Sequence, residues 1–136
     1  MNTKTQVNIS RRYYCPQSKL WRAIEEGHLF IYTGAIKDKV SFDFKKGGKI
    51  HIEWIDGGVE SSMDGEFLEI TPQDKIVFSW NTSYGVKSIV FLDIKSFPEY
   101  CEFNLRHEFP EGSATRDYDF GWDDAMFDLK KHIYRG

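Results

Sequence analysis

The sequence has little of several features that would assign it to a specialised class of protein. It contains two cysteines, Cys15 and Cys101, which are too few for a disulfide framework. No apolar run approaches the roughly 20 residues that a membrane-spanning helix needs. The N-terminal stretch MNTKTQVNIS lacks the apolar segment of a signal peptide. We therefore expect a cytoplasmic protein in which both thiols are free.

Clustered positive charge and metal-ligand spacing are also missing from the sequence. The 18 Lys and Arg residues and 21 Asp and Glu residues give a net charge of −3, and the basic residues are scattered. A scattered distribution argues against a nucleic-acid or anionic-membrane partner. The four histidines are far apart in sequence, at His28, His51, His107 and His132. We therefore expect no metal site and no cofactor.

Aromatic residues, by contrast, are plentiful. The 136 residues include 11 Phe, 7 Tyr and 4 Trp, and many of these alternate with polar residues. Such alternation is typical of strands with one buried face. Two interpretations remain open: a core that is simply bulky, or a core built around a cavity with aromatic walls.

Residues 116–135 form the longest stretch with a clean helical period. Its apolar residues recur at steps of three and four, which places them on one face of a helix: Tyr118, Trp122, Ala125, Met126, Leu129 and Ile133. An isolated helix of this length is marginal in water. The preceding chain must therefore supply an apolar surface for it.

Period-two alternation dominates residues 39–109 and predicts six strands separated by short turns. One of these strands runs through Val40, Phe42 and Phe44, and another from Met63 to Ile70. A change of apolar parity between Phe67 and Leu68 predicts a β-bulge. Another strand, at Gln6–Tyr14, precedes two short helices that Gly27 separates. The sequence thus predicts a single α+β domain over residues 1–136, in which a curved antiparallel sheet of about seven strands grips one long helix.

A succession of short motifs carries a family resemblance: Cys15-Pro16 with Leu20-Trp21, Phe42-Asp43-Phe44, Gly47-Gly48, Gly65-Glu66-Phe67, Ile70-Thr71-Pro72, Phe78-Ser79-Trp80, Leu105-Arg106-His107-Glu108, and Gly121-Trp122 with Leu129. From about Val7 to Ile133 the chain resembles the heat-shock protein 90 ATPase activator homologue family. That family belongs to the START-like helix-grip superfamily, together with pollen-allergen-like domains. The resemblance implies a seven-stranded sheet, a long C-terminal helix and a cavity between them. Three positions depart from the usual residues of the family: Cys15, Tyr32 and Met126.

The predicted ligand site is the space between the sheet and the long helix. Its walls would come from Trp54, Phe67, Phe78, Trp80, Phe103, Trp122 and Met126, with Tyr32 near the mouth. His107 shares the parity of Phe103 and Leu105, so it should point inward as a polar anchor or an acid–base group. The alternative is a buried histidine whose partner is a neighbouring backbone carbonyl or carboxylate.

A second predicted surface lies on the convex side of the sheet. Ile89 and Phe91 have the opposite parity to the buried residues of their strand, and Val77 lies on the preceding strand. Together they predict an apolar surface for a partner or a second copy. The alternative is that long charged side chains cover it.

The function that we expect is non-catalytic binding of a small apolar or amphipathic molecule. One alternative is a chaperone-regulating or other protein-binding module that uses the convex surface. Another is a cyclase- or hydrolase-type enzyme that uses His107.

Overall fold

The computed structural model describes residues 5–31, 36, 39–56, 58–110 and 116–135, except for the side chains of residues 31, 56, 116–120 and 135. Its elements follow in the order β1 (Thr5–Tyr13), α1 (Gln17–Glu25), α2 (His28–Ile31), β2 (Val40–Phe42), β3 (Lys49–Asp56), β4 (Val59–Thr71), β5 (Lys75–Thr82), β6 (Lys87–Ser96), β7 (Cys101–Phe109) and α3 (Arg116–Arg135). This order and the bounds of α3 confirm the α+β prediction.

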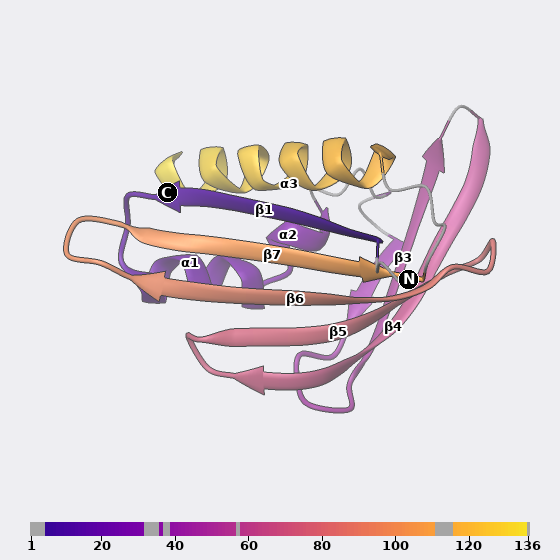
Figure 1. Ribbon diagram of the computed structural model, residues 1–136, viewed down its shortest axis with the longest axis horizontal. Coiled ribbons are helices and arrows are strands. Elements are labelled where there is room, and N and C mark those ends of the chain that lie inside the picture. The colour runs from indigo at the N-terminus through magenta and orange to yellow at the C-terminus, as the bar shows by residue number, and fades with distance from the viewer. Residues whose placement is uncertain (1–4, 32–35, 37–38, 57, 111–115, 136) are drawn as a thin grey trace.

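All seven strands belong to one antiparallel sheet in the order β1-β7-β6-β5-β4-β3-β2. The chain crosses from one edge of the sheet to the other through α1 and α2, and β2 to β7 then form a meander. Figure 1 shows the sheet curving around α1 and α2, with α3 lying along β1. No helix among the described residues is long and apolar enough to cross a membrane.

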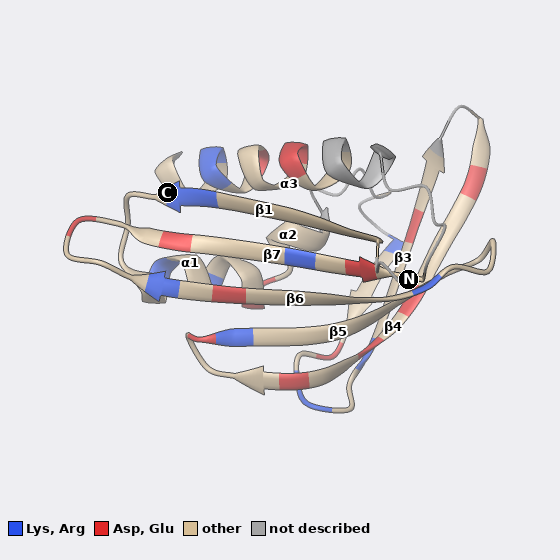
Figure 2. Cartoon of the chain, in the orientation of Figure 1, with Lys and Arg blue, Asp and Glu red and all other residues tan. Residues whose placement is uncertain are grey.

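Alternation along each strand builds the buried side of the sheet. In β7, Cys101, Phe103, Leu105, His107 and Phe109 are buried, whereas the residues between them are more exposed. The same alternation in β6 places Val90, Leu92 and Ile94 beside the inward residues of β7. Successive side chains of a strand point to opposite faces, so one face becomes continuous and apolar. The outer face carries interspersed acidic and basic residues (Figure 2).

Strand β4 contains the predicted bulge. The register with β5 shifts between Phe67 and Glu69, so that Leu68 is the extra residue. Close approach of β5 also explains Gly65, because a Cβ there would lie 2.1 Å from the Ser79 carbonyl oxygen. A bulge and a strand glycine both allow a sheet to bend.

Three strands differ from the sequence prediction in their boundaries. Strand β1 covers Thr5–Tyr13 rather than Gln6–Tyr14. Strand β2 ends at Phe42, and Phe44 lies outside it. The segment that follows keeps one bond to β3, from Asp43 N–H to the Lys49 carbonyl, and then bonds to β4. Gly47 N–H donates to the Phe67 carbonyl, and Phe67 N–H donates to the Gly48 carbonyl. Strand β4 starts earlier than predicted, at Val59 rather than Met63, because residues 59–62 pair with β3.

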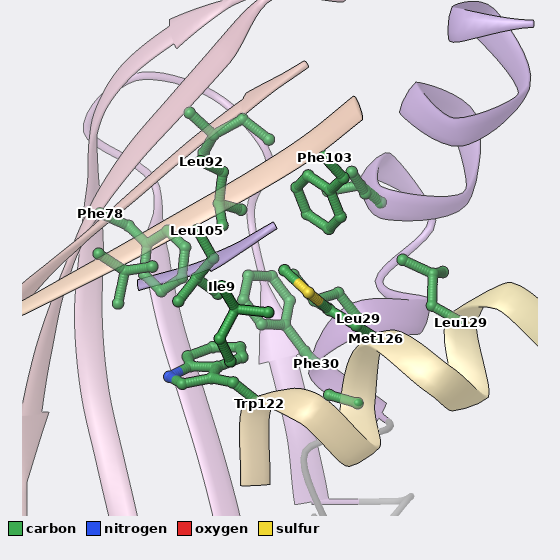
Figure 3. Close-up of a cluster of buried hydrophobic side chains, with 14 of the residues drawn as sticks. Ile9, Leu29, Phe30, Phe78, Leu92, Phe103, Leu105, Trp122, Met126 and Leu129 are labelled. Carbon is green, nitrogen blue, oxygen red and sulfur yellow. The ribbon is translucent and has the colours of Figure 1, made fainter. Parts of the chain in front are cut away.

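The long helix packs on the sheet through its predicted apolar face. Trp122, Ala125, Met126, Leu129 and Ile133 are all buried, and Figure 3 shows three of them facing the side chains of the sheet and α2. Polar contacts from the end of β1 add to this packing. The Tyr13 hydroxyl donates to the Met126 carbonyl at 2.7 Å, and Tyr14 N–H donates to the Tyr134 hydroxyl at 2.9 Å.

Truncation of Trp122 tests whether α3 is integral to the fold. Trp122→Ala removes a buried aromatic side chain and should lower the free energy of unfolding by about 3–5 kcal/mol. Asp124→Ala, at an exposed position of the same helix, should change it by less than about 0.5 kcal/mol. Equilibrium denaturation measures both. A loss below about 1 kcal/mol for Trp122→Ala would mean that α3 is peripheral.

Candidate functional site

The predicted wall residues lie on the inner face of the sheet and on the facing side of α3. Those that are buried almost completely are Phe67, Phe78, Trp80, Phe103, His107, Trp122 and Met126. Trp54 is half-buried against the same cluster. Tyr32 lies outside the described residues. The structure thus gathers these side chains in one layer, and their binding of a ligand stays a prediction.

Trp80 is the centre of this aromatic layer. Its ring centroid lies 5.3 Å from that of Trp122, 6.1 Å from that of Trp54 and 6.5 Å from that of Phe78. Tilted and edge-on pairs at such distances are favourable. The layer therefore joins β3, β5 and α3.

Two further rings belong to the layer and were absent from the sequence prediction. Phe30 of α2 packs edge-on against Phe78 at 5.5 Å, and Phe109 stacks on His107 at 3.9 Å. Phe109 shares the parity of His107 along β7, so the alternation in the sequence could have placed it on the inner face. Phe30 lies on a helix of four residues, which is too short for its buried face to be read from periodicity.

Buried His107 links the sheet to α3 through hydrogen bonds at both ring nitrogens. The indole Nε1–H of Trp122 donates to His107 Nδ1 at 3.0 Å, and His107 Nε2 lies 2.8 Å from Ser88 Oγ. An indole N–H can only donate, so Nδ1 carries no proton. A neutral imidazole then has its proton on Nε2 and donates it to Ser88. The Ser88 hydroxyl donates in turn to the Trp80 carbonyl at 2.9 Å.

Burial also determines the charge of His107. Desolvation lowers the pKa of its imidazole to about 3, because the apolar surroundings disfavour the charged form. The ring is therefore neutral at physiological pH. The two partners described above are an indole and a hydroxyl; the alternative considered from the sequence was a backbone carbonyl or a carboxylate.

The direction of these hydrogen bonds limits the chemistry of the Ser88–His107 pair. A serine nucleophile must give its proton to an unprotonated histidine nitrogen. Here Nε2 carries the proton, and the serine hydroxyl points to a carbonyl. The pair instead provides polar groups inside an apolar layer: on the imidazole, Nδ1 accepts a hydrogen bond and Nε2 donates one.

The convex face brings together the second group of predicted residues. Val77 of β5 pairs with Phe91 of β6, and Ile89 on the same side of β6 is 37% exposed. The Arg106 guanidinium lies 4.2 Å above the Phe91 ring. A hollow of about 490 Å³ crosses this face, and its lining includes Val77, Phe91, Asn104 and Arg106. Phe91 is therefore partly covered, whereas Ile89 is accessible.

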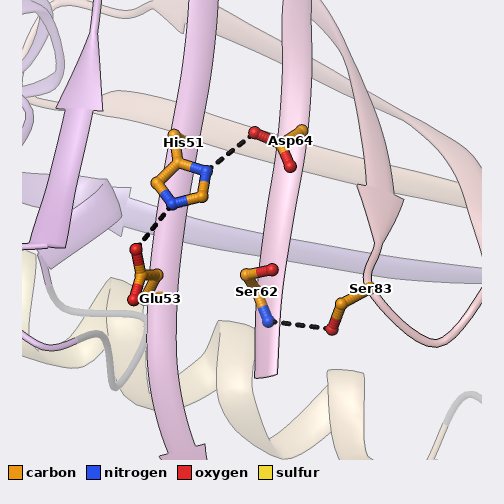
Figure 4. Close-up of polar contacts among 5 residues, drawn as sticks. All are labelled: His51, Glu53, Ser62, Asp64 and Ser83. Carbon is orange, nitrogen blue, oxygen red and sulfur yellow. Dashed lines mark hydrogen bonds and ion pairs between the residues drawn. The ribbon is translucent and has the colours of Figure 1, made fainter. Parts of the chain in front are cut away.

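An imidazole between two carboxylates also lies on the outer side of the sheet (Figure 4). His51 Nδ1 is 2.7 Å from Asp64, and its Nε2 is 2.8 Å from Glu53. The hydrogen bond to Glu53, followed by that to Asp64, raises the pKa of His51 above its ordinary value. Among the described residues, no group of three or more His, Cys, Asp and Glu is arranged to hold a metal ion.

Comparison with solved structures shows that the fold is a helix-grip fold. Protein MLL2253 from Mesorhizobium loti matches with a TM-score of 0.80 at 22% identity, over 96% of this chain and 98% of that one. Ara h 8.0201 matches with a TM-score of 0.80 at 11% identity, over 98% of this chain and 100% of that one. CalU16 from Micromonospora echinospora matches with a TM-score of 0.78 at 18% identity, over 96% of this chain and 74% of that one.

The sequence itself assigns the family. The family described as activator of Hsp90 ATPase homolog 1-like protein matches residues 14–133, and the chain belongs to that family. None of the curated proteins with which the sequence was compared matches it. Family and fold support a domain that binds a ligand or regulates a chaperone of the Hsp90 type.

The pH dependence of stability tests the environment of His107. The unfolded state binds a proton near the ordinary histidine pKa of about 6.5, and the native state binds it only near pH 3. Between these values the unfolded state holds more protons, so this contribution to stability falls as the pH falls, by up to about 1.4 kcal/mol per pH unit. Equilibrium denaturation of the wild type and of His107→Gln from pH 7 to pH 4 measures this contribution as the difference between the two proteins, because both contain the same carboxylates. An NMR titration that places the His107 pKa near its ordinary value would contradict the assignment.

His51 should behave in the opposite way. Its raised folded-state pKa means that its stabilising effect is complete below the unfolded-state pKa and is lost as the pH rises through the folded-state pKa. Because His51 is largely solvated, the effect should not exceed about 1 kcal/mol. Asp64→Asn should lower the His51 pKa in an NMR titration. The control is Glu69→Gln: the Glu69 carboxylate pairs with Lys75, so its removal should leave the His51 pKa unchanged. Equal shifts in both variants would mean that the long-range charge of the protein, not the Asp64 contact, sets the pKa.

Proposed function

We propose that this protein binds a small apolar or amphipathic molecule between the curved sheet and α3 and releases it unchanged. The observation that carries the proposal is the chain of buried hydrogen bonds through Trp122, His107 and Ser88, set within an aromatic layer. Ligand sites usually combine apolar walls with a few placed polar groups. The wall residues, with Tyr32 near the mouth, remain those predicted from the sequence.

The hydrogen bond between Trp122 and His107 joins two different elements. His107 and Ser88 lie on the sheet, whereas Trp122 lies on α3. A ligand that enters between helix and sheet separates the indole N–H from His107 Nδ1. The ligand must then supply a donor to Nδ1 and an acceptor to the indole N–H, since a buried polar atom without a partner costs about 1–3 kcal/mol. A hydroxyl group does so, because it donates to Nδ1 and accepts from the indole. We therefore favour an apolar ligand that carries a hydroxyl.

A second candidate function is protein binding through the convex face. The family name supports a chaperone partner, and exposed Ile89 beside the hollow at Phe91 provides an apolar contact. Catalysis by His107 is the third candidate and fits the site least well, because the hydrogen bonds run in the wrong direction to activate Ser88.

A thermal-shift screen tests the first candidate. The library should hold pairs of apolar molecules that differ only in one hydroxyl group. A binder gains thermal stability by mass action on the folded state, and the hydroxylated member of a pair should shift the melting temperature more. His107→Ala should weaken affinity by the equivalent of about 0.5–1.5 kcal/mol. Ile89→Ser, on the convex face, is the matched control and should leave the shift unchanged.

Mass spectrometry of each hit after incubation separates the three candidates. Unaltered ligand agrees with binding alone. A product that disappears with His107→Ala would show an enzyme instead. If no molecule shifts the wild type, and binding to an Hsp90-type chaperone is lost with Ile89→Ser, the protein-binding candidate replaces the first.

A further inference from the structure

The two thiols meet at the opposite end of β7 from His107. Cys101 begins β7, pairs with Tyr13 of β1 and is buried. Its Sγ lies 3.5 Å from the Cys15 carbonyl oxygen and 3.6 Å from the Tyr13 carbonyl oxygen. Cys15 is partly exposed, in the short connection between β1 and α1. The Cys101 thiol thus lies against the backbone of Cys15, 86 positions away in the sequence, and each thiol shifts the pKa of the other.

The environments of the two sulfur atoms differ in a way that gives them separate roles. Burial raises the pKa of Cys15, but the Cys101 thiol, the Lys19 ammonium and the backbone N–H of Leu20 in α1 each act to lower it. Burial and the neighbouring Cys15 raise the pKa of Cys101 to about 12. Because the thiolate is the nucleophile, Cys15, which is partly exposed whereas Cys101 is buried, is the thiol that reacts first with an external oxidant. Cys101 is placed to react only with Cys15.

We propose that Cys15 and Cys101 form a reversible redox site, at which a small-molecule disulfide oxidises the pair to an intramolecular disulfide. The Cys15 thiolate attacks one sulfur of the oxidant, and the S–S bond of the oxidant breaks to release one thiolate. Cys101 then loses its proton and attacks the Cys15 sulfur, which releases the second half of the oxidant. The protein loses two protons and two electrons, and the oxidant becomes two thiols.

The location of the bond gives the oxidation a structural consequence. Tyr13 and Tyr14, directly before Cys15, bind Met126 and Tyr134 of α3. A Cys15–Cys101 disulfide ties this segment covalently to β7. It also closes a long loop, which restricts the unfolded chain and stabilises the folded one. The oxidised protein should therefore melt at a higher temperature, by roughly 10 °C.

Oxidised glutathione is the probe, applied to the folded 136-residue chain and followed by alkylation in denaturant, intact mass and thermal melting. The wild type should become lighter by two hydrogens, lose both alkylation sites and melt higher, and dithiothreitol should reverse all three changes. Cys101→Ala should instead accumulate one glutathione adduct at Cys15. Cys15→Ser, which keeps only the buried thiol, should acquire none. Cys101→Ser serves as a second variant if the alanine protein is unstable.

Three results would overturn the proposal. One is a wild type that keeps both thiols alkylatable or stops at a glutathione adduct, which means that the sulfurs do not meet. Another is glutathione on Cys101 in the Cys15→Ser protein, which reverses the assigned roles. The third is a disulfide between two chains, seen as a dimer on a non-reducing gel. A disulfide that forms without raising the melting temperature would refute the structural consequence.

Discussion

Two buried hydrogen bonds decide where the long helix lies on the sheet. Apolar burial supplies most of the free energy of this contact but has no direction, so it would tolerate sliding of one surface on the other. The bonds from Tyr13 to the Met126 carbonyl and from Trp122 to His107 have fixed partners. Breaking either one leaves a polar atom buried without its partner, which costs about 1–3 kcal/mol. The register of α3 against β1 and β7 is therefore set by polar groups inside an apolar layer.

The same layer serves as core and as candidate binding site, and these two roles make opposite demands. Rings that contact each other around Trp80 stabilise the fold through packing. A ligand must take over some of those contacts, and it must also replace the indole N–H at His107. A molecule that satisfies both conditions has an apolar body and one hydroxyl group, because an apolar molecule alone would leave Nδ1 without a donor. Under the proposed function, the polar group would thus distinguish between ligands that the aromatic walls accept equally.

Periodicity in the sequence predicted which face each residue occupies but not which residues touch across elements. The bounds of α3 and the bulge at Leu68 follow from local patterns and were predicted correctly. The partners of His107 were not, because Ser88 is 19 residues away and depends on the length of the β6–β7 turn. The first residues of β4 have no apolar alternation, and pairing with β3 makes them a strand. The contact between His51 and Asp64 also depends on that register, because the two residues pair directly across β3 and β4.

The two buried hydrogen bonds of α3 are also mechanically linked. Trp122 and Met126 are one helical turn apart on the same face, so a rigid helix cannot carry one of them away from the sheet while the other stays. Opening the helix at His107 therefore strains the bond from Tyr13, and holding Tyr13 in place resists that opening. Tyr13 is itself fixed by pairing with Cys101 at the end of β1. The contacts of α3 with Tyr13, beside Cys101, and with His107 thus lie a single helical turn apart.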